Sequence, residues 1–133
     1  MTERRRIGCE MAILLVLLTL GSFLAYELNK GWTPGKVERI ATNDVPLGST
    51  EKDAKEWLSS QGFTDIGSGS AEGSRYFETR DGISLEGAIR VCYGDAPNPN
   101  VDLFCDGTVS VFFFFDADGR LVKIYVREWI CSL

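Results

Sequence analysis

The stretch TVSVFFFFDADGRLVKIYV, residues 108–126, decides the fold because it places four consecutive phenylalanines directly before a turn. The letters DADG at 116–119 are typical of a type I turn with glycine at the left-handed position, so the stretch predicts a β-hairpin. Successive side chains of a strand point to opposite faces, and two phenylalanines must therefore face each side of the sheet. Which pair faces inward depends on the length of the turn, since one step of register exchanges the pairs.

Both faces of this strand need a cover. One pair of phenylalanines is expected to pack under a helix through Trp57 and Leu58. The other pair requires the membrane-proximal connector, a partner, or crossing side chains from the last strand, RLVKIYVREWI at 120–130. An exposed aromatic face would suit a protein partner. The residues proposed for this contact surface are Phe112, Phe114, Tyr125 and Trp129.

The helix is predicted from STEKDAKEWLSSQGF at 49–63. Thr50 followed by Asp53 resembles a capping box, and Gly62 fits the C-terminal end with Phe63 folding back. The apolar residues recur with helical spacing and form one stripe. They are Ala54, Trp57 and Leu58.

Further strands are expected before the hairpin. RYFETR at 75–80 is a candidate strand, and ISLEGAIRVCY at 83–93 alternates between apolar and polar positions. The glycine- and serine-rich segment at 68–74 is interpreted as a loop. The predicted fold class is α+β, with one helix packed on an antiparallel sheet of three to five strands.

An apolar segment precedes this domain. Residues 11–26, MAILLVLLTLGSFLAY, carry no charge, and arginines occupy positions 4–6. Sixteen helical residues span roughly 24 Å, short of a hydrocarbon core of about 30 Å unless residues 7–9 extend the run. We interpret it as a signal-anchor transmembrane helix with its N-terminus in the cytoplasm and the domain outside. A cleaved signal peptide and a buried soluble helix are the alternatives.

These features divide the chain into three parts. Residues 1–26 form the cytoplasmic tip and membrane helix, 27–47 a juxtamembrane connector, and 48–133 an extracytoplasmic domain. The whole chain has a net charge of −5, from 14 basic and 19 acidic residues. The first part holds three arginines and two glutamates, so the rest has eleven basic and seventeen acidic residues, a net charge of −6. Such a charge disfavours nucleic acid as a partner.

Cysteine usage agrees with an oxidising compartment. Cys92 and Cys105 flank a proline-containing segment and are the candidate disulfide pair, which would contribute about 3 kcal/mol by restricting the unfolded chain. Cys131 could displace either partner or remain free. Three reduced, buried thiols are the alternative.

Little in the sequence points to catalysis. The chain contains no histidine, which excludes Ser-His-Asp and Cys-His arrangements built from it alone. Ser49 and Lys52 match the Ser-x-x-Lys pattern of penicillin-recognising enzymes, but the companion motifs are absent and a helix cap explains Ser49. We expect no cofactor and no metal, and we identify no small-molecule substrate.

Two segments resemble a known family. VPLGSTEKDAKEWLSSQGF at 45–63 and VSVFFFFDADGRLVKIYV at 109–126 resemble the outer-membrane assembly lipoprotein domains of the SmpA/OmlA or BamE type, whose architecture the β-lactamase-inhibitor-like proteins share. The chain departs from the family in having no lipidated cysteine, one clear helix instead of a pair, and an additional loop between two cysteines. The resemblance implies a non-catalytic, protein-binding domain and identifies no site residue.

The expected function is therefore a non-enzymatic protein-interaction domain held at the membrane by residues 11–26. The alternative is a secreted or periplasmic inhibitor-like domain released by signal-peptide cleavage, with the loop between Cys92 and Cys105 as its wedge.

Overall fold

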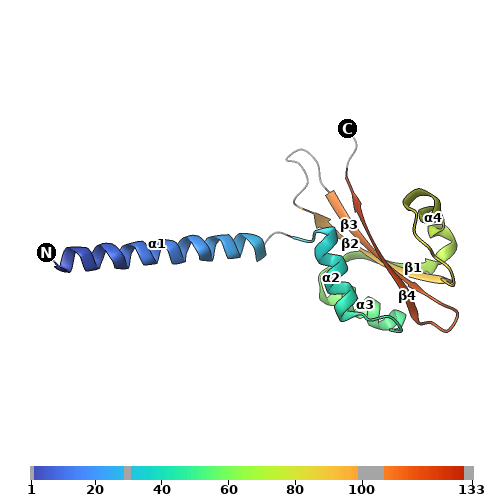
Figure 1. Ribbon diagram of the computed structural model, residues 1–133. Helices are drawn as coiled ribbons and strands as arrows, with labels where there is room; N and C mark the ends of the chain where they lie inside the picture. Colours follow the sequence, from blue (N-terminus) through green and yellow to red (C-terminus); the bar gives the residue numbers. More distant parts are fainter. Residues whose placement is uncertain (1, 29–30, 99–106, 131–133) are drawn as a thin grey trace. The chain divides into compact units, whose positions relative to one another are not determined.

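The computed structural model describes residues 2–28, 31–98 and 107–130, and of residues 2–6 and 25–28 it describes the backbone alone. The chain divides into two compact units, residues 1–31 and 32–133 (Figure 1).

The first unit is the helix α1, Thr2–Leu28. Within it, Ile7–Leu24 is a window of 18 residues that is long and apolar enough to cross a membrane, and none of the window is buried inside the protein. Eighteen helical residues span about 27 Å, close to the thickness of a hydrocarbon core. The predicted apolar helix is thus confirmed, and a signal sequence near an N-terminus has the same properties.

The second unit contains a four-stranded sheet in which all neighbours are antiparallel and the strand order follows the sequence. Its strands are β1 (Thr64–Ser70), β2 (Arg90–Asn98), β3 (Gly107–Phe115) and β4 (Leu121–Trp129). The predicted hairpin joins β3 to β4. Asp116 Oδ1 accepts hydrogen bonds from the backbone N–H groups of Asp118 and Arg120, and Gly119 has the expected positive φ of 74°.

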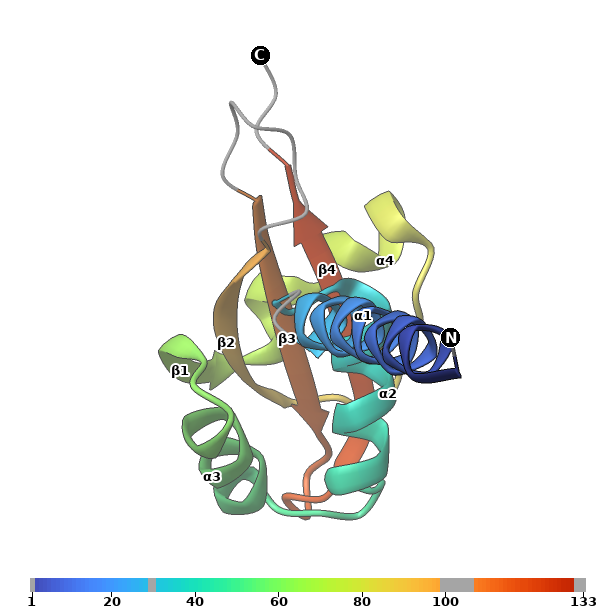
Figure 2. The same cartoon turned by 90° about the vertical axis from the view of Figure 1, so that its left-hand side faces the viewer.

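Two helices, α2 (Pro34–Asp44) and α3 (Glu51–Ser60), cover one face of the sheet (Figures 1 and 2). The prediction of a connector at 27–47 is corrected here, because α2 contributes Val37 and Ala41 to the main core and Val45, its C-cap, packs with them. Thr33 caps this helix and Pro34 occupies its first position, where a missing N–H has no cost. The compact domain therefore begins at Trp32.

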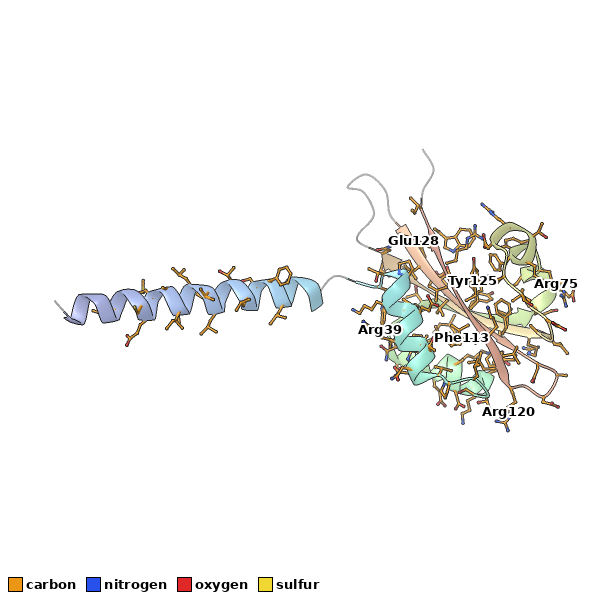
Figure 3. All side chains as sticks on the ribbon, viewed as in Figure 1. Arg39, Arg75, Phe113, Arg120, Tyr125 and Glu128 are labelled. Carbon is orange, nitrogen blue, oxygen red and sulfur yellow. The ribbon has the colours of Figure 1, made fainter. Side chains whose placement is uncertain are left out.

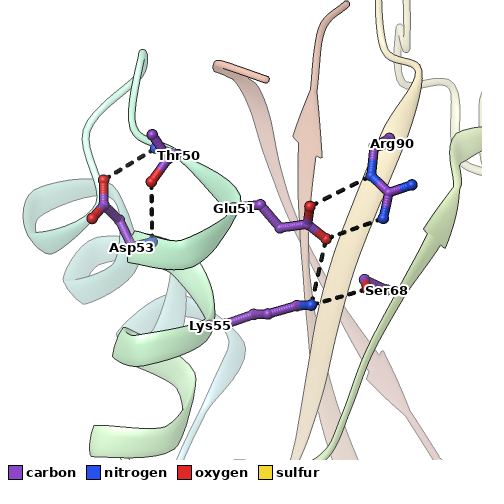
Figure 4. A network of polar contacts seen from close by, with 6 residues as sticks. All are labelled: Thr50, Glu51, Asp53, Lys55, Ser68 and Arg90. Carbon is purple, nitrogen blue, oxygen red and sulfur yellow. Dashed lines mark hydrogen bonds and ion pairs between the residues drawn. The ribbon is translucent and has the colours of Figure 1, made fainter. Parts of the chain in front are cut away.

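The helix α3 is confirmed, with both hydrogen bonds of the Thr50–Asp53 capping box present. The first two turns of α3 contact the sheet. Glu51 pairs with Arg90 of β2 at 3.4 Å, and Lys55 donates a hydrogen bond to Ser68 of β1 at 3.0 Å (Figure 4). Trp57 Nε1 donates to Asp44 Oδ2 at 3.0 Å, which joins α3 to α2.

The opposite face carries a smaller cover, the 3₁₀ turn η1 (Ala71–Ser74) and the short helix α4 (Tyr76–Asp81) (Figure 1). The prediction of a strand at 75–80 is wrong. Arg75 pairs with Glu72 and Glu78, each at 3.1 Å and three residues away, a spacing that favours a helix. The strand expected from residue 83 begins only at Arg90, and the loop expected at 68–74 is partly β1.

The register of β3 with β2 and β4 shows which face of the sheet each phenylalanine occupies. Phe113 and Phe115 lie in the main core under α2 and α3, and Trp57 meets the Phe113 ring edge-on with ring centroids 5.9 Å apart (Figure 3). Phe114 is completely buried in the second core, where Phe77 of α4 lies, and Phe112 packs against the same core. Both faces are thus covered by elements of the chain itself.

The assignment of α2 to the core leads to a stability prediction. Ala41→Asp places a carboxylate in a fully buried position and should lower the free energy of unfolding by at least about 3 kcal/mol. The neighbouring exposed change Thr42→Asp alters the charge equally and should cost less than about 1 kcal/mol. Chemical denaturation followed by circular dichroism measures both. Equal stability of the two variants would show that α2 is the peripheral connector first expected.

Candidate functional site

A groove of about 480 Å³ lies on the sheet face that η1 and α4 cover. Serines and glycines of β1 and η1 line one side, and β2, β3 and β4 supply most of the larger side chains. The aromatic residues of the groove are Tyr76, Phe77, Tyr93, Phe112 and Trp129. Tyr76, Tyr93 and Trp129 are exposed by 49%, 36% and 37%, so aromatic surface remains in water here.

The polar part of the groove is a chain of hydrogen bonds across three strands. Trp129 Nε1 donates to Ser110 Oγ at 2.8 Å, and Ser110 Oγ donates to Asp95 Oδ1 at 2.5 Å. Ser110 is only 4% exposed, and its hydroxyl group is used both as donor and as acceptor. This series of hydrogen bonds holds the Asp95 carboxylate and the Trp129 ring in fixed positions.

A second polar cluster joins α4 to β4 beside the groove. Tyr125 Oη donates to Asp81 Oδ2 at 2.5 Å, and Arg127 Nη1 pairs with the same oxygen at 2.9 Å (Figure 3 labels Tyr125). The Arg127 guanidinium also lies over the rings of Phe77 and Trp129, at 5.3 and 4.2 Å from their centroids. Burial raises the pKa of Tyr125 to about 12, and the hydrogen bond to Asp81 and its negative charge act in the same direction.

The predicted surface residues are thereby placed. Phe112 and Trp129 line the groove, and Tyr125 lies beside it in the cluster with Asp81. Phe114 is completely buried, so it is not available to a partner.

Sequence reasoning missed Asp95, Tyr93, Tyr76 and Asp81 as parts of this region. The alternation of Val91, Tyr93 and Asp95 along β2 was a usable signal for the first two, because it places them on one face. Nothing local marks α4, whose position is set by tertiary packing of Phe77.

Cys92 is a free thiol in the main core, completely buried. Burial raises its pKa to about 12, and the negative charge of Glu51 adds to this. Cys105 lies outside the described residues, so its predicted pairing with Cys92 stays untested.

Ser49, which matches the Ser-x-x-Lys pattern, has a structural role. Ser49 Oγ donates to the carbonyl of Pro46 at 2.6 Å, next to the start of α3. Within residues 2–28, 31–98 and 107–130, no three metal-ligating side chains gather into a group.

No family model matches this chain, and neither the search of curated proteins nor the search of solved structures finds a match. The resemblance to BamE-like domains stays a prediction. Two helices, α2 and α3, lie on one face of the sheet where one helix was predicted. A helix pair on an antiparallel sheet is a general architecture and does not identify a function.

The Tyr125–Asp81 hydrogen bond leads to a pH prediction. Between pH 10 and 12 the unfolded chain releases the Tyr125 proton while the folded protein retains it, so this group lowers the stability as the pH rises through that range. Tyr125→Phe should cost about 1 kcal/mol at neutral pH, and this cost should shrink above pH 10. Denaturation of both proteins across this pH range measures the difference. The control is Tyr76→Phe, which alters an exposed tyrosine. This change should leave the pH dependence of the stability as it is in the unaltered protein.

The position of Cys92 leads to a second prediction. In the folded protein Cys92 should resist alkylation by iodoacetamide, because the thiol is buried and the thiolate is scarce at neutral pH. Unfolding should make it react at once. Peptide mapping of non-reduced protein identifies any disulfide. A Cys92–Cys105 peptide would support the predicted disulfide and would contradict a buried, free Cys92 thiol.

Proposed function

We propose that the protein is a non-enzymatic interaction domain held on the outer side of a membrane by α1. The observation that carries the proposal is the aromatic groove, in which three large side chains stay exposed although the domain already has two cores. Exposed aromatic surface beside fixed polar groups is typical of protein contact sites.

Two further observations support the proposal. The helix α1 is suited to a membrane by length and composition, and arginines at 4–6 favour a cytoplasmic N-terminus. In addition, the two carboxylates at and beside the groove are engaged in the structure, Asp81 by Tyr125 and Arg127, and Asp95 by Ser110. Side chains fixed in this way suit binding better than proton transfer.

The test is site-specific photocrosslinking in intact cells. A benzoylphenylalanine placed at Tyr76, which is exposed in the groove, should form a defined adduct with another membrane or envelope protein. The same group placed at Arg39, which is exposed on α2, serves as the control and should not form that adduct. Identical adducts from both positions, or none from Tyr76, would contradict a partner bound at the groove.

The alternative is a secreted or periplasmic inhibitor-like domain. One observation favours it, since a cleavable signal sequence near an N-terminus has the same length and composition as Ile7–Leu24. Mass spectrometry of the protein recovered from cells separates the two proposals. An intact N-terminus in the membrane fraction supports the anchored domain, and a mature N-terminus beyond the apolar segment supports the released one.

A further inference from the structure

The groove combines aromatic faces with one carboxylate, Asp95, and with hydroxyl groups from Ser68, Ser70, Ser74, Tyr76 and Tyr93. The Ser110 hydroxyl and the Trp129 N–H already donate hydrogen bonds within the protein, Trp129 to Ser110 and Ser110 to Asp95. The second carboxylate oxygen of Asp95 makes no hydrogen bond within the described residues, and a carboxylate only accepts. A ligand that matches this site must therefore bring donors to Asp95.

The charges around the groove favour a positively charged ligand. Among the described residues no basic side chain pairs with Asp95, and the nearby Arg127 is already paired with Asp81. The part of the chain after residue 26 has a net charge of −6, which repels anions and attracts cations. An uncharged apolar ligand would cover the carboxylate without compensating its lost hydration.

The aromatic rings favour the same ligand. Phe112 lies between Tyr93 and Tyr125, with ring centroids 6.1 and 6.2 Å away, and forms part of the groove floor. Rings of this kind attract a cation over their faces. The stacking of Arg127 on Trp129 at 4.2 Å is an internal example of the same interaction in this region.

We propose that the groove binds the cationic side chain of an arginine or lysine on a partner protein, with Asp95 as its counter-charge and Tyr93 and Phe112 as its aromatic wall, beside Trp129, whose ring already carries Arg127. This inference rests on the proposed interaction function and specifies the chemistry of the contact.

The experiment uses the full chain in an uncharged detergent, because choline headgroups are themselves cations. Fluorotryptophan labelling gives three ¹⁹F signals, from Trp32, Trp57 and Trp129, and Trp129→Phe assigns the third. Titration with Nα-acetyl-arginine methylamide should shift the Trp129 signal saturably. The citrulline analogue has nearly the same shape and no charge, and it should not bind.

Two matched variants test the counter-charge. Asp95→Asn keeps an acceptor for Ser110 and should weaken binding about tenfold. Asp118→Asn removes the same charge from the turn at the opposite end of β3 and should change the affinity less than about twofold. Tyr93→Leu, which removes one aromatic face, should also weaken binding.

The outcomes are distinct. Equal binding of the arginine and citrulline probes, no saturable shift, or equal effects of Asp95→Asn and Asp118→Asn would overturn the inference. A specific crosslink at Tyr76 without arginine binding would leave the interaction function standing and refute only the cationic contact. Arginine binding without any crosslinked protein would support the cationic site and refute the proposed partner bound at the groove in cells.

Discussion

The fold depends on a constraint set by β3, where four consecutive phenylalanines alternate between the two faces of the sheet. Phe113 and Phe115 on one face and Phe114 on the other are all buried. Burying a phenylalanine contributes about 1.5–3 kcal/mol, so neither face can be left in water without losing much of the stability of a small domain. The chain therefore supplies two covers, α2 with α3 on one face and η1 with α4 on the other.

The predictable parts of this structure have strong local signals. The β3–β4 hairpin follows from DADG, and α3 follows from the Thr50–Asp53 capping box and its apolar stripe. The helix α2 lay within the predicted connector at 27–47. Proline and glycine after Thr33 are common in connecting segments, although proline is also favoured at the first helical position. The spacing of Val37, Ala41 and Val45 was available as evidence for it.

The site was harder to predict because its parts come from distant segments. The contact between Asp81 and Tyr125 joins residues 44 positions apart, and it depends on α4, a helix of six residues. A helix this short has little intrinsic stability and forms only where packing supports it. Local propensity therefore could not place Asp81. Strand alternation puts Phe112 and Phe114 on one face, but only the observed register shows that this face is the one with the groove.

The groove itself follows from a difference in length between the sheet and its smaller cover. Nine residues of β3 span about 30 Å, whereas six helical residues of α4 span only about 9 Å. The cover buries Phe114, whereas at the Ser110 end of the strand the groove is lined by Trp129, which is 37% exposed. There β3 changes from phenylalanine to serine on this face, and the hydrogen bonds from Trp129 through Ser110 to Asp95 replace apolar burial. The change in residue type marks where the apolar core ends and the polar part of the groove begins.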